Sequence, residues 1–205
     1  MTALPVIRKA RCVQGRTLLL RDACEADAPF IHALRSDPVR ARHLSAVPPQ
    51  VQAQADWLRR YAGSQGQAYF VIADGQNGAP LGTVRLYDAR GTVFCWGSWL
   101  LLPGLPARCG IESALMVYHY ALWLGFDSAW FEVRQENASV WRFHENFGAR
   151  RTGAANGHYQ YELPPAALQA ALQKYRRYLP DGIRVLEPVH DLTTKILSLS
   201  SVLLL

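Results

Sequence analysis

The spacing of apolar residues along the chain alternates between a strand period and a helix period. Runs rich in β-branched and aromatic residues predict strands over 16–21, 67–73, 80–87, 92–102, 128–134 and 158–163. Apolar residues three and four apart predict helices over 22–37, 48–63, 107–125 and 137–146, and a further helix runs from Pro164 to about Tyr178. This order of elements predicts a mixed α/β fold of the α+β kind, in which helices flank one twisted sheet.

Three of the predicted strands follow one another with only turn-rich segments between them, at 74–78 and 88–91. Strands joined by such short turns pair antiparallel, so this part of the sheet is predicted to be antiparallel. Gly97, inside the third strand, predicts a bulge or a close backbone approach. Trp96 and Trp99 lie three apart on that strand, which places them on opposite faces unless a bulge intervenes.

A length of 205 residues, 50% of them hydrophobic, is enough for one well-buried core. Residues 1–163 are predicted to form the main domain. Residues 164–205 are predicted to be a C-terminal helix and an apolar tail that pack on this domain or on a partner subunit, as in a homodimer. The apolar end, which begins at Ile196, is shorter than the roughly 20 residues that cross a bilayer, so we predict no membrane span.

The formal net charge of +6 favours an anionic partner without identifying it. Nucleic acid and a phosphate-bearing small molecule both fit, but the 22 basic residues form no Lys/Arg run, so no nucleic acid is predicted. The four cysteines show neither C-x-x-C pairing nor zinc-ligand spacing to a histidine, so no metal site is predicted. Scattered cysteines and an N-terminus without an apolar run predict a cytoplasmic protein with reduced thiols.

A Pro- and Gly-rich loop leads into the helix that contains Gly110. The first turn of a helix presents unpaired backbone N–H groups and the positive end of the helix dipole, which suit a pyrophosphate. Gly110 would let the backbone approach such an anion, and Arg108 would add positive charge. An ordinary helix N-terminus explains the same residues if nothing else supports an anion site.

The following segment resembles the GNAT superfamily of acyl-CoA N-acyltransferases. After the strand 128–134 come Asn137 and a short helix, with His144 where that family usually has tyrosine and Gly148-Ala149 where it has Gly-Phe. The resemblance extends over residues 16–163. Two N-terminal motifs are similar to those of the branch that includes ribosomal-protein and sugar-nucleotide acetyltransferases, namely Leu20-Arg21 with Asp27-Ala28, and Gln52 with Trp57-Leu58.

The resemblance implies acetyl-CoA as the co-substrate. It also implies a largely antiparallel sheet whose central strands splay apart around the thioester, where a backbone N–H polarises the carbonyl. The residues implied to bind the coenzyme are Leu100, Leu101, Leu102, Arg108, Cys109, Gly110, Ile111 and Asn137.

The coenzyme loop departs from the family pattern at two positions. Ala107 replaces a glutamine or arginine, and Glu112 replaces a small residue. A carboxylate close to a pyrophosphate is electrostatically unfavourable. Glu112 must therefore turn away, pair with an arginine, or mark weakened coenzyme binding.

Two residues are candidates for proton transfer. The resemblance places His144 near the coenzyme sulfur as a general acid, and its reference pKa near ~6.5 predicts partial charge at neutral pH. A structural histidine beside the coenzyme is the alternative. Glu132 on the central strand is the candidate general base, with a sheet residue bonded to its neighbour as the alternative. Glu25, His32 and Trp99 are the candidate contacts to the acceptor.

The acceptor is predicted to be the amino group of a nucleotide-linked amino sugar. The segments 141–149 and 174–179 resemble GNAT enzymes of bacterial surface-polysaccharide pathways, and the basic surface suits an anionic acceptor. A small free amine such as a polyamine would need an acidic pocket, and the 16 acidic residues form no cluster. A protein N-terminus or lysine is a second candidate acceptor, and a GNAT-like binding module without turnover is a third interpretation.

Overall fold

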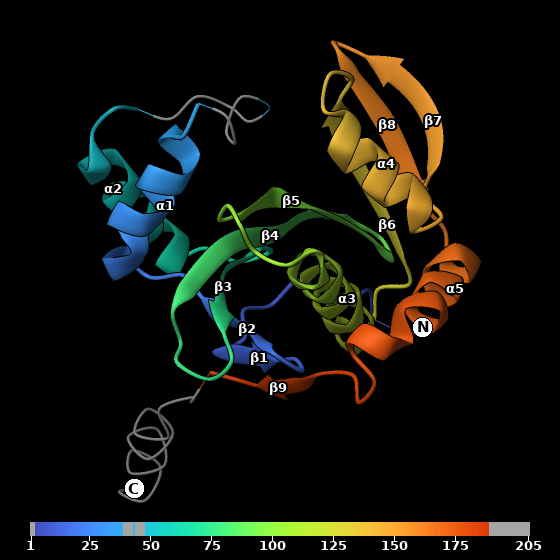
Figure 1. The fold of residues 1–205 in the computed structure, drawn as a ribbon, viewed down its shortest axis with the longest axis horizontal. Helices are drawn as coiled ribbons and strands as arrows, with labels where there is room; N and C mark the ends of the chain where they lie inside the picture. Colours follow the sequence, from blue (N-terminus) through green and yellow to red (C-terminus); the bar gives the residue numbers. More distant parts are fainter. Residues whose placement is uncertain (1–2, 39–42, 44–47, 189–205) are drawn as a thin grey trace, which may run out of the picture.

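The computed structural model describes residues 3–38, 43 and 48–188 (Figure 1). The predicted mixed α/β architecture is confirmed. The elements are, in order, β1 (Cys12–Gln14), β2 (Leu18–Asp22), the 3-10 turn η1 (Glu25–Asp27), α1 (Ala28–Ser36), α2 (Val51–Ala62), β3 (Ala68–Asp74), β4 (Pro80–Arg90), β5 (Val93–Leu101), α3 (Ala107–Leu124), β6 (Ser128–Arg134), α4 (Ala138–Asn146), β7 (Arg150–Ala155), β8 (His158–Leu163), α5 (Pro165–Tyr175), η3 (Arg176–Tyr178) and β9 (Arg184–Leu186).

All the strands belong to one sheet, in the order β7-β8-β6-β5-β4-β3-β2-β1-β9. Within the described residues, neighbouring strands pair antiparallel except β5 and β6, which are parallel. The predicted antiparallel run of β3, β4 and β5 is confirmed. β4 continues to Arg90, so the turn predicted over 88–91 is wrong in its bounds, and the chain reverses at Gly91 with a positive φ of 61°.

Different helices cover the two faces of the sheet. On β3, Ala68, Phe70 and Ile72 join the core around α3, whereas Tyr69 and Val71 join a second core with α1 and α2. Because successive side chains of a strand point to opposite faces, α3 lies on one side of the sheet and α1 and α2 on the other. Figure 1 shows the sheet curving around α3, with α1 and α2 outside the curve.

α3 is the centre of the main core. The predicted stripe of apolar residues on α3 is only part of its buried surface, because every residue from Glu112 to Tyr118 is buried. A helix that is apolar on nearly all sides packs against neighbours on nearly all sides. α3 contacts the sheet on one side and α5 and η3 on others. Its position fixes where its first turn meets β5.

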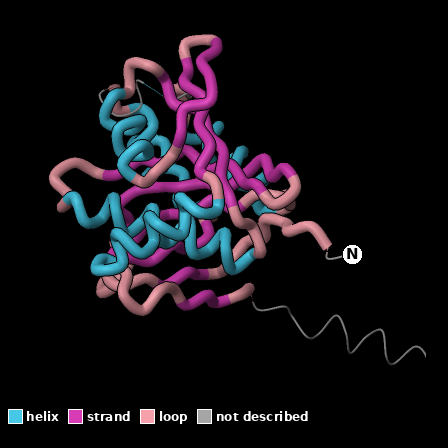
Figure 2. The backbone as a smooth tube through the Cα atoms, turned by 90° about the vertical axis from the view of Figure 1, so that its right-hand side faces the viewer, coloured by secondary structure: helices cyan, strands magenta, loops and turns pink. Residues whose placement is uncertain are grey.

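The C-terminal part adds to the same sheet. β9 pairs antiparallel with β1, with Cys12 opposite Leu186. These two strands and β7 were not predicted, because strands of three residues are too short to show a period and β7 has no buried side chain. β7 and β8 form a hairpin that extends beyond the other strands (Figure 2). The tail predicted from Ile196 lies outside the described residues.

All four cysteines are free thiols. No helix in the described ranges is long and apolar enough to cross a membrane.

Candidate active site

The two central strands, β5 and β6, separate after three residue pairs. They pair in parallel from Val93 and Ser128 to Cys95 and Trp130. Beyond this point β5 stays paired with β4, and β6 stays paired with β8. The strands therefore diverge, and a cavity of about 150 Å³ opens between them. We call it the central cavity, and it confirms the predicted splay of the central strands.

β5 carries a bulge where the central cavity opens. Thr83 pairs with Leu100 and Arg85 pairs with Gly97, so β5 has one more residue than β4 between these pairs. Ser98 adopts a φ of 48°, and the Thr83 hydroxyl donates to the Ser98 carbonyl oxygen at 2.8 Å. The bulge predicted from Gly97 is confirmed, one residue further along the strand.

The bulge turns two tryptophans to the same side of β5. The ring centroids of Trp96 and Trp99 are 5.4 Å apart. Trp99 Nε1 donates to Ser113 Oγ at 3.2 Å, and Ser113 Oγ donates to the Gly110 carbonyl oxygen at 3.0 Å. Trp99 thus lies against the beginning of α3, beside the predicted coenzyme loop. Its contact with the acceptor stays a prediction.

The first turn of α3 is suited to an anion. It contains no acidic residue, and its N-cap Pro106 makes no side-chain cap. Arg108 is exposed there, whereas Cys109 is buried and donates its N–H to the Pro106 carbonyl oxygen at 2.9 Å. A Cβ on Gly110 would lie 3.7 Å from Trp99 and 3.8 Å from Leu101. The remaining N–H groups of this turn are available to a phosphate oxygen that approaches over Gly110.

Glu112 turns away from this loop. Its carboxylate is 2% exposed and accepts hydrogen bonds from the Thr17 N–H and hydroxyl, both at 2.6 Å, and from the Leu18 N–H at 3.0 Å. The turn between β1 and β2 approaches so closely that a Cβ on Gly15 would lie 2.9 Å from Glu112 Oε1 and 2.6 Å from Met116 Sδ. Of the three outcomes that the sequence left open, the structure selects the first, because the negative charge is directed at β2.

His144 is buried among aromatic rings at the edge of the central cavity. Its ring centroid lies 4.1 Å from that of Phe131 and 5.2 Å from that of Trp96, and its exposed fraction is 5%. Burial lowers the pKa of His144 to about 3. The predicted partial charge is therefore wrong, because the apolar surroundings exclude the imidazolium form at pH 7. Within the described residues Nδ1 is buried without a hydrogen-bond partner.

Glu132 lies on the opposite face of β6 from His144. Phe131, which contacts the His144 ring, and Val133 are buried, whereas Glu132 between them is exposed and accepts a hydrogen bond from Gln160 Nε2 at 3.3 Å. Glu132 lines both the central cavity and a neighbouring cavity of about 360 Å³. Five residues that line both cavities were not predicted from the sequence: His43, Tyr87, Ser98, Arg134 and His158. Only Arg134 had a signal there, because it continues the alternation of polar residues along β6.

The other predicted site residues are divided between the site and the surface. Asn137 is the N-cap of α4 and lines the central cavity. His32 lines a further cavity, formed by α1, α2 and strands β3 to β5, where its Nε2 lies 3.0 Å from the Pro48 carbonyl oxygen. Glu25 is not brought to any of these cavities, because it is exposed and pairs with Arg59 at 3.0 Å. Leu100, Leu101 and Leu102 form the end of β5 and the residue after it, and Ile111 follows Gly110 on α3.

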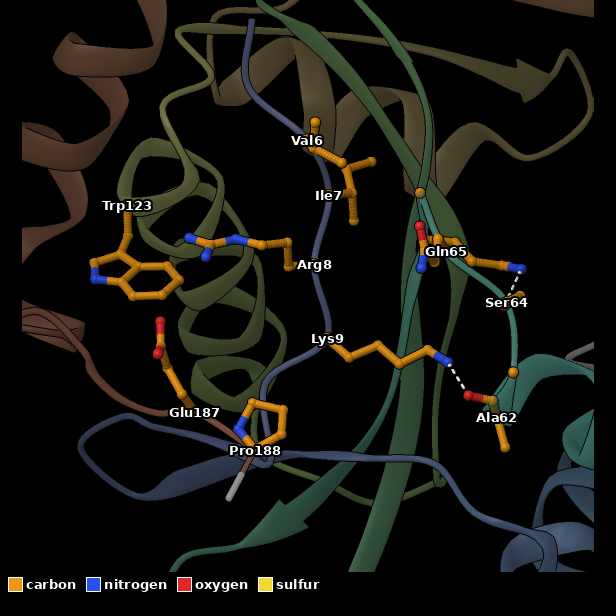
Figure 3. A pocket seen from close by; sticks show the side chains of 13 residues that line it. Val6, Ile7, Arg8, Lys9, Ala62, Ser64, Gln65, Trp123, Glu187 and Pro188 are labelled. Atoms are coloured by element: carbon orange, nitrogen blue, oxygen red, sulfur yellow. Dashed lines mark hydrogen bonds between the residues drawn. The ribbon is translucent and has the colours of Figure 1, made fainter. Parts of the chain in front are cut away.

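A cavity of about 520 Å³ lies at the far end of α3 (Figure 3). Trp123, which lines it, comes thirteen residues after Gly110, or about 20 Å along the helix axis. Lys9 in this cavity already donates to the Ala62 carbonyl oxygen at 2.8 Å. The cavity shares none of its lining residues with the central cavity, so we assign it no part in the chemistry.

Comparison with known proteins identifies the family. The model of the acetyltransferase (GNAT) domain matches residues 17–150. This chain belongs to the GNAT acetyltransferase family. The apo form of FdhC, described as a nucleotide-linked sugar GNAT, is 33% identical to this GNAT chain with a TM-score of 0.71, and the match covers 81% of this chain and 97% of that one.

More distant GNAT structures share the fold. A GCN5-related N-acetyltransferase from Brucella melitensis is 19% identical with a TM-score of 0.71, over 88% of this chain and 91% of that one. The spermidine N-acetyltransferase from Vibrio cholerae, in complex with CoA and spermine, is 16% identical with a TM-score of 0.65, over 75% of this chain and 98% of that one. A comparison with curated proteins gives no match.

Family membership makes this chain an acyl-CoA-dependent N-acyltransferase. GNAT enzymes use acetyl-CoA, and the first turn of α3 fits this co-substrate because it offers backbone donors beside Gly110 and no carboxylate. Because the Glu112 carboxylate points away from this turn, it is no reason to expect weakened coenzyme binding. Among the described residues, no group of three or more His, Cys, Asp or Glu side chains is placed to hold a metal ion.

We expect Gly110→Asp to raise the Kd for acetyl-CoA by about tenfold or more, because the new carboxylate would face the phosphates. Gly110→Ala is the matched control, since its Cβ would make only ordinary contacts of 3.7 and 3.8 Å with Trp99 and Leu101. Calorimetric titration with acetyl-CoA measures both variants. Equal affinity in the aspartate and alanine variants would show that the coenzyme phosphates lie elsewhere.

Proposed function

We propose that this GNAT enzyme transfers an acetyl group from acetyl-CoA to the amino group of a nucleotide-linked amino sugar in surface-polysaccharide synthesis. The observation that carries the proposal is the 33% identity to a nucleotide-linked sugar GNAT over 97% of that chain. The acceptor side of the site supports it, because the cavity that meets the central cavity at Glu132 is lined by Arg35, Arg134 and two histidines. Such a lining suits an anionic acceptor.

The chain's contribution to binding acetyl-CoA begins at α3. The N–H groups of its first turn would hold the pyrophosphate, with Arg108 adding charge from the exposed side. Leu100, Leu101 and Leu102 would run beside the extended arm that ends in the thioester. Acetyl-CoA would supply an activated acetyl carbonyl, and bound in the opening between β5 and β6 this carbonyl would be within reach of an amine.

His144 and Glu132 would act from opposite faces of β6. His144 is neutral at pH 7 because burial lowers its pKa to about 3, so it would act through its single N–H as a donor to the departing sulfur. Glu132 is exposed on the acceptor face, where its carboxylate would accept the proton that the amine must lose. Coenzyme A would then leave as the thiolate, stabilised by the hydrogen bond from His144, while the proton of the amine goes to Glu132 on the acceptor side.

The other acceptors are less well matched to these residues. A polyamine carries several positive charges, which arginine side chains at the acceptor cavities would repel. A protein N-terminus or lysine needs an open groove that admits a peptide, and no observation on the described residues favours it over a small anionic acceptor.

The acceptor class can be tested by following thiol release from acetyl-CoA with a panel of amines. We expect kcat/KM for nucleotide-linked amino sugars to exceed that for spermidine and for Lys-containing peptides by at least about tenfold, a difference of about 1.4 kcal/mol in transition-state binding. The same assay with each amine omitted corrects for hydrolysis of the thioester. A clear preference for spermidine or for a peptide would contradict the proposed acceptor.

A further inference from the structure

The cavity that His32 lines continues from the site toward α1 and α2. It has a volume of about 360 Å³ and meets the central cavity at the β5 bulge, because Ser98 lines both. We call it the arginine cavity. Its walls come from α1, α2 and the strands beside them, and the side chains that decide its chemistry are His32, Trp57, Arg60, Tyr69, Arg85 and Ser98.

Arg85 is the central charge of the arginine cavity. Its guanidinium carbon lies 5.2 Å from the Trp57 ring centroid and 5.0 Å from that of Tyr87. Its Nε donates to Gln67 Oε1 at 2.9 Å, so its described hydrogen-bond partner is a neutral amide. Two aromatic rings and an amide fix the orientation of the guanidinium without neutralising its charge.

Two of the arginines in the arginine cavity, Arg85 and Arg60, have no acidic partner among the described residues. Neither Arg85 nor Arg60 forms an ion pair there, and no aspartate or glutamate lines the cavity. Arg85 is half-buried, and this burial lowers its pKa. A desolvated cation without an acidic partner is stabilised by a bound anion.

We propose that the arginine cavity binds the diphosphate of the acceptor, with Arg85 and Arg60 as its contacts. This inference rests on the proposed function and deepens it, because it assigns the anionic part of the acceptor to one place and the amine to another. The diphosphate lies between α2 and β4, the sugar passes Ser98, and the amine reaches the central cavity near Glu132. A guanidinium recognises phosphate oxygens through two parallel N–H donors, which suits Arg85 in its fixed orientation.

The composition of the arginine cavity selects this ligand class over others. A polyamine or a basic peptide would add positive charge beside Arg60 and Arg85 and would meet no carboxylate. An uncharged amino sugar would leave the desolvated Arg85 without a counter-charge. The cavity should therefore bind an amino sugar that carries a diphosphate more tightly than the same sugar without one.

The binding test uses inorganic pyrophosphate with the whole chain, in the presence of saturating coenzyme A. The coenzyme occupies the first turn of α3, so that the remaining pyrophosphate binding reports on the arginine cavity. Calorimetric titration should show that Arg60→Gln and Arg85→Gln each raise the Kd for pyrophosphate by about tenfold. Arg59→Gln is the matched control, because Arg59 is the neighbour of Arg60 but pairs with Asp56 at 2.7 Å and with Glu25.

The kinetic test compares one amino sugar with and without its nucleotide diphosphate. Arg60→Gln and Arg85→Gln should raise the KM for the nucleotide-linked sugar about tenfold. They should leave the KM for the methyl glycoside and for acetyl-CoA unchanged. Arg60 is exposed, so its variant stays informative even if Arg85→Gln impairs folding. Pyrophosphate should compete with the nucleotide-linked acceptor and not with acetyl-CoA.

The outcomes separate this inference from the proposed function. Unchanged pyrophosphate affinity and unchanged KM in both arginine variants overturn the inference, even if nucleotide-linked sugars are acetylated. Pyrophosphate binding that saturating coenzyme A abolishes in the unaltered chain overturns it as well, since α3 would then be the binding site. If both arginine variants weaken pyrophosphate binding but no nucleotide-linked sugar is acetylated, the anion site is supported and the proposed acceptor is contradicted.

Discussion

Replacing Glu112 with alanine is expected to lower the free energy of unfolding by about 3 kcal/mol. The carboxylate accepts three hydrogen bonds from Thr17 and Leu18, and the N–H of Leu18 is buried. Alanine would leave that N–H without its partner and open a cavity between α3 and the β1–β2 turn. For a chain of 205 residues, this corresponds to a fall in Tm of about 6–12 °C, measured by calorimetry.

Glu112→Gln separates hydrogen bonding from charge. The glutamine oxygen can accept hydrogen bonds from both backbone N–H groups, and its amide can donate to the Thr17 hydroxyl. The free energy of unfolding should therefore fall by less than about 1 kcal/mol. The affinity for acetyl-CoA should change less than about threefold in either variant, because the carboxylate points at β2. Tighter acetyl-CoA binding in both variants would show instead that the Glu112 charge acts on the coenzyme.

The direction of the Glu112 side chain could not be predicted from the sequence pattern. The position in the loop pattern predicts a charge beside the pyrophosphate, since the neighbouring residues form the coenzyme turn. The direction of the side chain is set by donors at Thr17 and Leu18, which lie about a hundred residues earlier in the chain. Gly15 and Met116 complete this contact. Such long-range pairing follows from the sheet order and not from local spacing.

Helices and strands were predictable where the segment was long enough to show a repeating pattern of apolar residues. The bounds predicted for β6 and β8 agree with the structure, because each is a compact run between turn residues. β1 and β9 are too short to show a period, and they are held by pairing with each other. The bulge in β5 was predictable from Gly97, but its effect was not, since only the observed register places Trp96 beside Trp99.

The site was predictable in its coenzyme half more than in its acceptor half. Gly110, Asn137 and His144 belong to continuous motifs, whereas the acceptor cavities are assembled from separate elements. Arg60 on α2 and Arg85 on β4 show no joint signal in the sequence. Glu25 was predicted to contact the acceptor, but its pairing with Arg59 holds it on the surface. Residues on different elements become neighbours only through the fold.

His144→Phe is expected to make the stability of the chain less sensitive to acid. The pKa of His144 is about 3 in the folded chain, against about 6.5 in the unfolded chain. Between these values the unfolded state binds one more proton, so the stability falls as the pH falls through this window. The histidine contributes its full stability above about pH 6.5 and loses about 2 kcal/mol of it by pH 5. Phenylalanine cannot take up the proton.

Denaturant unfolding at pH 7.5 and pH 5 measures this difference within each protein. A constant packing cost of the larger ring cancels, because each protein is compared with itself. Burial also lowers the pKa of His119, but that group is present in both proteins and drops out of the comparison. The rings around His144 do not titrate near this pH, since they are Phe131, Trp96, Trp99 and Phe143. An equal loss of stability in both proteins would mean that His144 is solvated and charged at pH 5. The proposal that it acts as a neutral donor to the sulfur would then fail, because an imidazolium would be available at the site.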